Sequence, residues 1–228
     1  MATAEITGPD ISDAPAATVL RDVEWKTYCK LRDAEANNHL RMTYLDGNLT
    51  IVSPQLAHDL DSRLLLYVVT AVARAWRVRL MAVGTTTLRR EGRAELLGAG
   101  KEPDEGFYLG DDVVAVRGNR SLDLAVDPPP TLAIEVDHKA DSSAALPTYA
   151  RLRVPELWRL DATGRTLWFG RLVGEDYAEV ARSVALSRLT PPLVLQALEA
   201  RAHQPDDLDW LDWLDAWARN LPEPPPTA

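Results

Sequence analysis

The sequence predicts a mixed α/β domain, with a sheet built around one central strand and flanked by helices. Three observations indicate this class: a long amphipathic segment at 55–76, a strongly apolar strand-like run at 131–137, and two hairpin patterns at 41–52 and 156–169. Hairpins are interspersed with helices instead of a regular strand–helix alternation, which argues against a doubly wound fold.

The first half of the chain supplies a short helix, a hairpin and the long helix. Apolar residues from Val23 to Leu31 have helical spacing, which predicts a helix ending by about His39. Residues 41–52 alternate around Asp46-Gly47-Asn48, a strong short-range hairpin signal. The segment 55–76 then carries its leucines and valines on one face, as expected for a helix that covers a sheet.

The second half supplies most of the sheet. Further strands are expected at 81–83, 85–89 and 106–109, with a glycine-containing loop at 91–100, and an edge strand at 177–180. The run Thr131-Leu-Ala-Ile-Glu-Val-Asp137 is apolar enough to be a central strand covered on both faces, yet it ends in acids. A helix is expected at 142–152, where Pro147 limits its start.

Domain organisation follows from composition. Residues 1–20 and 222–228 are expected to be a disordered arm and tail, and 21–200 to be one domain. Residues 201–221 form a separate Trp-rich helix, in which Trp210, Trp213 and Trp217 lie beside leucines. At that spacing the tryptophans are expected to cover an apolar face of the domain or of a second protomer, not to stack on bases.

Composition restricts the function classes. The 228 residues are 46% hydrophobic, and 34 acidic against 25 basic residues give a net charge of −9. The single cysteine, Cys29, excludes an internal disulfide and a cysteine-based zinc site, and a cytoplasmic location is expected. Membrane association is not expected, because no apolar run approaches the length of a bilayer span and the N-terminus lacks a secretory signal pattern. The acidity argues against nonspecific nucleic-acid binding.

Two acids are candidates for metal chemistry. Asp104 precedes the strand expected at 106–109, and Glu135 follows apolar residues of the central strand, so the two can meet across the sheet. Converging carboxylates suit a hard divalent cation, which polarises a phosphodiester and acidifies bound water. Asp104 alone is more typical of a turn cap than of a ligand, whereas a carboxylate such as Glu135 is costly to bury unless it is paired or metal-bound.

Neighbouring residues extend this constellation. In an extended chain Glu135, Asp137 and Lys139 point to the same side, because side chains alternate. Lys139 would then orient the attacking water or neutralise the phosphate, Asp137 would take a second metal or tune Lys139, and the Val136 carbonyl would help to hold the cation. His138, on the opposite strand face, is expected to be structural.

Five segments resemble the Uma-two family of restriction endonucleases, which belongs to the PD-(D/E)XK nuclease superfamily. They are the block of Asp46-Gly47, Ser53-Pro54 and His58, and the runs 84–90, 102–108, 127–137 and 149–158. The resemblance extends from about residue 40 to about residue 200. It implies a restriction-endonuclease-like core, here with an N-terminal helix and hairpin and a C-terminal helix. It also implies Asp104 and Glu135 as metal-binding acids, and Mg²⁺- or Mn²⁺-dependent DNA cleavage.

The sequence departs from the family pattern at the lysine. Related sequences place a lysine ten residues after the strand glutamate and four before the tyrosine, and here that position is Ala145. The superfamily position two residues after Glu135 holds Asp137. Lys139 is the nearest substitute and Lys101 a weaker one. The alternative is a catalytically degenerate nuclease fold that binds nucleic acid or protein.

Substrate contacts are expected from one histidine and two arginines. His58 matches the family's histidine and would contact a phosphate, although a local hydrogen bond at the helix start is an equally good interpretation. Arg89 and Arg90 belong to a basic concentration between 74 and 93, which is either the phosphate-facing side or a solvated face. Cutting both DNA strands is simplest with two active sites, which favours a homodimer.

Overall fold

A computed structural model describes residues 17–52, 56–119, 121–137 and 142–223. Over these residues the strands are β1 (Ala17–Leu20), β2 (Arg41–Leu45), β3 (Asn48–Val52), β4 (Leu80–Ala82), β5 (Leu88–Glu91), β6 (Gly98–Lys101), β7 (Glu105–Leu109), β8 (Leu132–Asp137), β9 (Glu156–Asp161), β10 (Thr166–Val173) and β11 (Asp176–Glu179). The helices are α1 (Trp25–Asp33), α2 (Leu56–Ala75), α3 (Asp112–Val116), α4 (Leu146–Leu152), α5 (Pro191–Ala200) and α6 (Asp207–Arg219). The described residues also contain the 3₁₀ turns η1 (Glu35–Asn37), η2 (Ser142–Ala145) and η3 (Arg201–His203).

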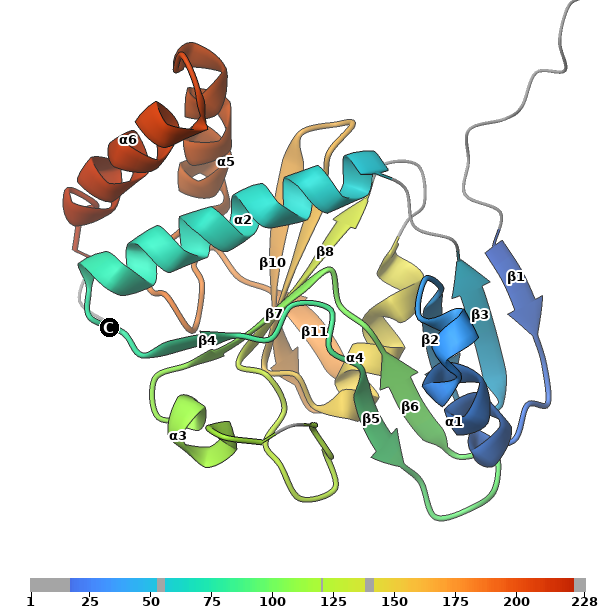
Figure 1. The fold of residues 1–228 in the computed structure, drawn as a ribbon. Helices are drawn as coiled ribbons and strands as arrows, with labels where there is room; N and C mark the ends of the chain where they lie inside the picture. Colours follow the sequence, from blue (N-terminus) through green and yellow to red (C-terminus); the bar gives the residue numbers. More distant parts are fainter. Residues whose placement is uncertain (1–16, 53–55, 120, 138–141, 224–228) are drawn as a thin grey trace, which may run out of the picture.

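The strands form two sheets (Figure 1). The smaller has the order β1-β3-β2-β6-β5, and the larger has the order β11-β10-β9-β8-β7-β4. In the larger sheet β8 pairs antiparallel with β7 and parallel with β9, so the strand expected to be central is central. The fold class expected from the sequence, a mixed α/β domain with helices on the sheet, is confirmed.

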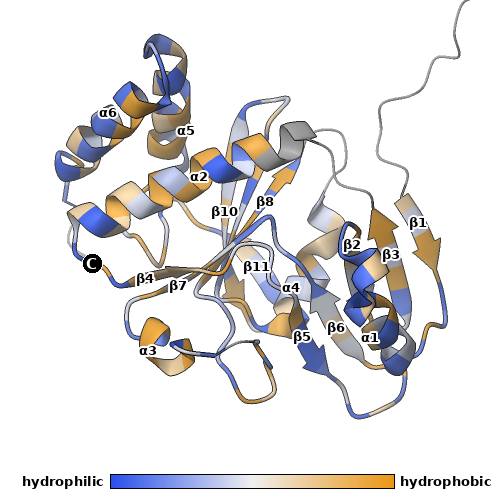
Figure 2. Cartoon of the chain, viewed as in Figure 1, coloured by the Kyte–Doolittle hydropathy of each residue, from blue (hydrophilic) through white to orange (hydrophobic). Residues whose placement is uncertain are grey.

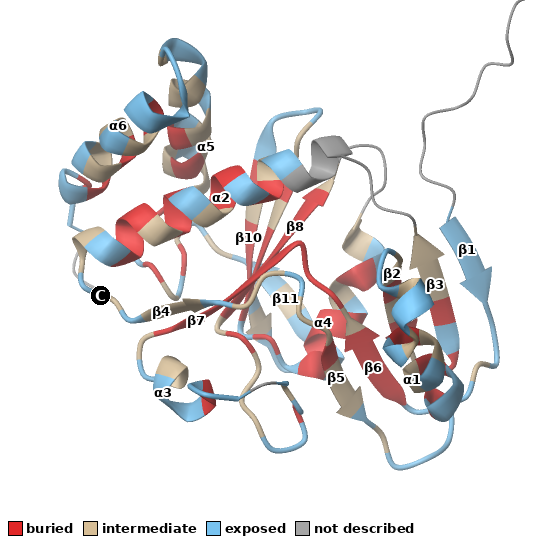
Figure 3. Ribbon diagram, viewed as in Figure 1, coloured by how far each residue is buried: buried red, intermediate tan, exposed pale blue. Residues whose placement is uncertain are grey.

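Helices cover the larger sheet in layers. Leu65, Val68, Val69 and Val72 of α2 are fully buried against it, and charged residues of α2 such as Arg63 and Arg74 are exposed (Figures 2 and 3). Helix α4 packs against the smaller sheet's β6 and against β11 of the larger one. Helices α5 and α6 pack on α2 (Figure 1). The main core therefore lies between the larger sheet and the α2–α5–α6 layer.

The tryptophan helix, α6, covers this core. Trp210 is fully buried, and its indole Nε1 donates a hydrogen bond to the Ala197 carbonyl of α5 at 2.9 Å. Trp213 and Trp217 stack on each other with ring centroids 5.9 Å apart and pack against the same core. The expectation that the stripe covers an apolar face is thus confirmed for the domain's own core.

Several boundaries differ from the sequence-based expectation. Residues 17–20, placed in the expected arm, pair with β3 as β1, and 98–101, expected to be loop, form β6. The Gly-Ala-Gly-Lys sequence of β6 has no apolar alternation, so its strand state comes from pairing with β2 and β5 on either side. The helix expected at 142–152 begins as η2 and becomes α4 only at Leu146.

Close packing of two aromatic side chains explains the glycines of β6. A Cβ on Gly98 would come within 2.7 Å of the Trp25 ring, and a Cβ on Gly100 would overlap the phenol of Tyr28. Trp25 and Tyr28 are both buried from α1. The glycines therefore let α1 lie directly on the smaller sheet.

We expect Gly100→Ala to destabilise the protein by about 2 kcal/mol or more, because fully buried Tyr28 must move to admit the methyl group. Urea denaturation followed by circular dichroism measures the change. Ala178→Ser adds one heavy atom at an exposed position of β11 and serves as the control, with an expected effect below about 0.5 kcal/mol. Equal stability of the two variants would contradict the packing argument.

Candidate functional site

Glu135 is buried in the middle of the larger sheet, near the end of β8. Side chains alternate along β8, so Ile134 and Val136 join the core under α2 while Glu135 points to the opposite face, toward α4. There Glu135 Oε1 accepts a hydrogen bond from the Tyr149 hydroxyl of α4. The same oxygen lies 3.1 Å from Lys101 Nζ at the end of β6. The buried Glu135 carboxylate is thus held by a side chain from helix α4 and by one from strand β6, which belongs to the other sheet.

Asp104 lies beside β8, in the segment that joins β6 to β7. Its backbone N–H donates to the Ile134 carbonyl at 3.1 Å, and its Oδ2 accepts from the Val136 N–H at 2.8 Å. The side chain of Asp104 therefore accepts a hydrogen bond from β8 that a backbone carbonyl of the neighbouring strand would otherwise accept. The two acids that were singled out from the sequence converge at the junction of β7 and β8.

Burial changes the electrostatics of both acids. Burial raises the pKa of Asp104 to about 6, although Lys101 and the Val136 N–H favour the charged form. Burial also raises the pKa of Glu135 to about 7; Lys101 opposes this rise and the charge of Asp104 adds to it. Burial therefore makes the charged forms of both acids costly, and a positive charge nearby lowers that cost.

Lys101 places a positive charge beside these acids. Its side chain is 11% exposed, and its Nζ also donates to the Glu102 carbonyl at 3.3 Å and lies 5.8 Å from the centre of the Tyr149 ring. Burial disfavours the charged ammonium, but Glu135 and Asp104 hold the pKa of Lys101 above its ordinary value. The sequence ranked this residue below Lys139 as the substitute lysine, because β6 was not recognised as a strand ending at the site.

The donor set fits a hard divalent cation. In the described part of the chain no group of three or more His, Cys, Asp or Glu side chains could hold a metal. Mg²⁺, however, is commonly bound through one or two carboxylates, and water and substrate phosphates complete its coordination. Asp104 and Glu135 supply the carboxylates. The Val136 carbonyl points to the same edge of β8 as the N–H that Asp104 accepts, so it adds a third oxygen. A cation there would stabilise the ionised forms of both buried acids.

Of the acidic, lysine and histidine candidates that remain, Asp137 contacts η2 and β9, and the side chains of the others lie outside the described residues. Asp137 accepts hydrogen bonds from the Ser142 N–H at 2.9 Å and from Arg159 at 2.9 Å, which ties the end of β8 to η2 and β9. Lys139, with His138, lies outside the described residues, as does the side chain of His58. Their expected roles therefore stay predictions.

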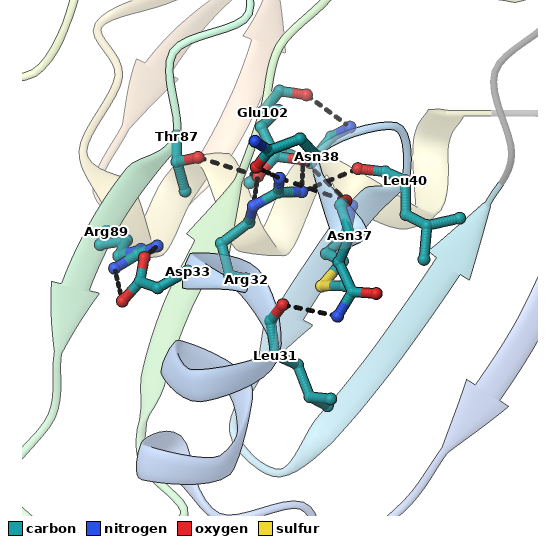
Figure 4. A network of polar contacts seen from close by, with 11 residues as sticks. Leu31, Arg32, Asp33, Asn37, Asn38, Leu40, Thr87, Arg89 and Glu102 are labelled. Carbon is teal, nitrogen blue, oxygen red and sulfur yellow. Dashed lines mark hydrogen bonds and ion pairs between the residues drawn. The ribbon is translucent and has the colours of Figure 1, made fainter. Parts of the chain in front are cut away.

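Arg89 and Arg90, expected to bind substrate, lie on β5 with protein partners. Arg89 donates to the Asp33 carboxylate at 2.5 Å (Figure 4) and lies over the Tyr28 ring at 5.8 Å. Arg90 reaches the Leu152 carbonyl at 3.5 Å, and desolvation lowers its pKa. These contacts hold β5 to α1 and α4; a role in substrate binding stays a prediction.

Glu102, two residues before Asp104, is the centre of a buried polar network that the sequence did not predict (Figure 4). Its carboxylate forms an ion pair with Arg32 of α1 at 3.4 Å and accepts from the Thr87 hydroxyl at 3.0 Å and the Met42 N–H at 3.1 Å. The network joins α1, β2 and the start of β5 to the segment that carries Lys101 and Asp104. No spacing in the sequence relates these residues.

Two more charged residues lie near the acids and were missed. The charge of Arg41, at the start of β2, favours the ionised forms of both Asp104 and Glu105. Glu105 is buried on the face of the larger sheet that α2 covers, opposite to the face of Glu135. Burial raises the pKa of Glu105 to about 7, and the charge of Arg63 of α2 opposes this rise. Tyr149 belonged to a motif of the family resemblance, but only its contact with Glu135 shows its role as a hydrogen-bond donor.

The mixed α/β fold of two sheets and their covering helices is consistent with the restriction-endonuclease-like class. Comparison with protein families agrees: the profile of the Uma2 family, described as "Putative restriction endonuclease", matches residues 25–203. The chain belongs to the Uma2 family. No curated protein matches it. In the described residues, no helix combines the length and apolarity needed to span a bilayer.

Proposed function

We propose that this protein is a metal-dependent endonuclease that hydrolyses phosphodiester bonds in DNA. The observation that carries the proposal is the convergence of Asp104 and Glu135, both buried, at the β7–β8 junction, with the Lys101 ammonium 3.1 Å from Glu135 Oε1. Family membership supports DNA as the substrate class.

The residues have distinct roles in this proposal. Asp104, Glu135 and the Val136 carbonyl would hold Mg²⁺ or Mn²⁺. When bound, the cation supplies positive charge that polarises the phosphodiester and acidifies the attacking water. Tyr149 fixes the Glu135 carboxylate by its hydrogen bond, and Asp137 fixes the end of β8 through Arg159 and Ser142.

The proposed reaction is a simple hydrolysis. The water oxygen forms a bond to phosphorus, and the bond from phosphorus to one bridging sugar oxygen breaks. The proton lost by water passes to solvent, and the leaving oxygen takes a proton from solvent. A homodimer would bring two such sites to the two strands; the molecular mass in solution by light scattering, with and without duplex DNA, tests that part.

We expect Asp104→Asn and Glu135→Gln each to lower the rate of supercoiled plasmid cleavage in Mg²⁺ or Mn²⁺ by on the order of 10³-fold, since each removes a charged cation ligand worth several kcal/mol. Asp111→Asn is the matched control, because Asp111 is an exposed acid paired with Arg79. It should cleave at the wild-type rate. Undiminished cleavage in both site variants would refute the assignment.

One observation favours a second candidate, a nuclease fold that binds DNA without cutting it. Glu135 Oε1 already accepts from Tyr149 and pairs with Lys101, and the family's lysine position is Ala145. Fluorescence anisotropy with labelled duplex, beside the plasmid assay, separates the two. Binding without cleavage by wild type in either metal would favour the second candidate.

A further inference from the structure

We propose that Lys101 serves as the active-site lysine of this protein, acting from strand β6 in place of a lysine at position 145. Resting on the proposed function, this inference names the residue that places a positive charge beside Asp104 and Glu135 for the phosphodiester. It differs from the expectation based on sequence order, which favoured Lys139 on the strand of Glu135.

The first support is the way in which Lys101 reaches the acids. Lys101 is the last residue of β6, paired with Thr43 of β2 and Leu88 of β5 in the smaller sheet, whereas Glu135 belongs to the larger sheet. Its ammonium nitrogen nevertheless lies 3.1 Å from Glu135 Oε1. A lysine side chain therefore crosses from one sheet to the central carboxylate of the other.

The second support is that several contacts hold the Lys101 side chain in this position. The Lys101 side chain is 11% exposed, its Nζ donates to the Glu102 carbonyl, and it lies over the ring of Tyr149. Glu102 is itself fixed by Arg32, so the backbone on the C-terminal side of Lys101 has little freedom. A surface lysine has none of these restraints and loses far more rotamer entropy when it is held at one point.

The third support comes from position 145. Ala145 is buried and precedes Tyr149 by four residues, one helical turn, and both belong to the same buried cluster on the α4 side of the larger sheet. Tyr149 reaches Glu135 from this face, and α4 packs against β6. A longer side chain at 145 and the side chain of Lys101 therefore approach Glu135 from adjacent elements. In this chain β6 supplies a cation at this place.

Lys101 keeps its proton throughout the proposed reaction. Its ammonium group donates hydrogen bonds to the attacking water or to a non-bridging phosphate oxygen, where negative charge grows as the water oxygen bonds to phosphorus. The proton lost by water goes to solvent, and the leaving sugar oxygen is protonated from solvent. Lys101 therefore acts as a fixed positive charge and not as an acid or base.

The experiment removes the lysine at position 101 and introduces one at position 145. Plasmid cleavage in Mn²⁺ and Mn²⁺ binding by titration calorimetry are measured for wild type, Lys101→Met, and Lys101→Met with Ala145→Lys. We expect Lys101→Met to lower cleavage by about 100-fold or more, as for loss of one fixed donor at a reacting oxygen. Mn²⁺ binding should be at least as tight as in wild type, because a cation beside Glu135 has been removed. The added Ala145→Lys should restore cleavage by about tenfold or more.

Controls separate failure of this inference from failure of the proposed function. Lys26→Met, at an exposed position of α1, should cleave like wild type. Lys101→Gln, which keeps a hydrogen-bond donor toward Glu135, replaces Lys101→Met if that variant does not fold, and should show the same loss of cleavage.

Wild-type cleavage by Lys101→Met or Lys101→Gln, with Asp104→Asn inactive, overturns the lysine assignment and leaves the proposed function intact. Loss of Mn²⁺ binding together with cleavage in both Lys101 variants shows a structural role and also overturns it. A wild type that neither binds Mn²⁺ nor cleaves overturns both.

Discussion

Replacing Arg32 by methionine should destabilise the protein by about 3–5 kcal/mol, the largest loss expected for a single substitution outside the apolar core. Arg32 and Glu102 pair at 3.4 Å with side chains only 9% and 3% exposed. The guanidinium also donates to the Leu40 carbonyl at 2.7 Å. Removing it leaves the Glu102 carboxylate buried with the Thr87 hydroxyl and the Met42 N–H but without its ion-pair partner (Figure 4). Urea denaturation measures the loss.

A comparison of buried and exposed pairs tests the cause of this loss. The Arg79–Asp111 pair is shorter, at 2.7 Å, but its side chains are 62% and 98% exposed, so Arg79→Met should cost less than about 1 kcal/mol. Adding Glu102→Gln to Arg32→Met should recover part of the stability, since it removes the uncompensated charge. Similar losses for Arg32→Met and Arg79→Met would show that the buried network does not stabilise the fold as argued.

Asp104→Asn should raise the stability of the metal-free protein at pH 8 by up to about 3 kcal/mol, although it is expected to abolish cleavage. Burial raises the pKa of Asp104 to about 6, roughly two units above its ordinary value, and each unit corresponds to about 1.4 kcal/mol. The folded state therefore binds a proton more tightly than the unfolded state. The contribution of Asp104 to stability is therefore greatest below pH 4 and is lost as pH rises through the folded pKa near 6.

Thermal melts in EDTA at pH 4 and pH 8 check this dependence. Asparagine has no charge to desolvate and still offers an oxygen to the Val136 N–H, so the advantage of Asp104→Asn should appear at pH 8 and vanish near pH 4. Asp111→Asn should change neither melt, because Asp111 is exposed. In excess Mn²⁺ the wild type should gain stability and Asp104→Asn should not. The sign of the effect would be contradicted if the stability of Asp104→Asn relative to wild type were lower at pH 8 than at pH 4.

The candidate site was only partly predictable from the sequence, for reasons that its residues make clear. Glu135 was recognisable because a carboxylate in an apolar strand is costly unless it has a partner. Lys101 was undervalued because Gly-Ala-Gly-Lys has no strand pattern of its own; β6 exists through its pairing with β2 and β5. The tyrosine that donates to Glu135 lies on α4, and no spacing rule specifies where that helix docks.

The sequence by itself determined the elements whose signals are local. The Asp46-Gly47 hairpin turn, the apolar face of α2 and the buried strand β8 follow from backbone preference and from the periodicity of apolar side chains, which neighbouring residues carry. Only the tertiary structure decided which charges meet. Arg32 and Glu102 are 70 residues apart, and Lys101 pairs with Glu135 across two sheets. Such contacts depend on how whole elements pack, because charge attraction acts through space and leaves no period along the chain.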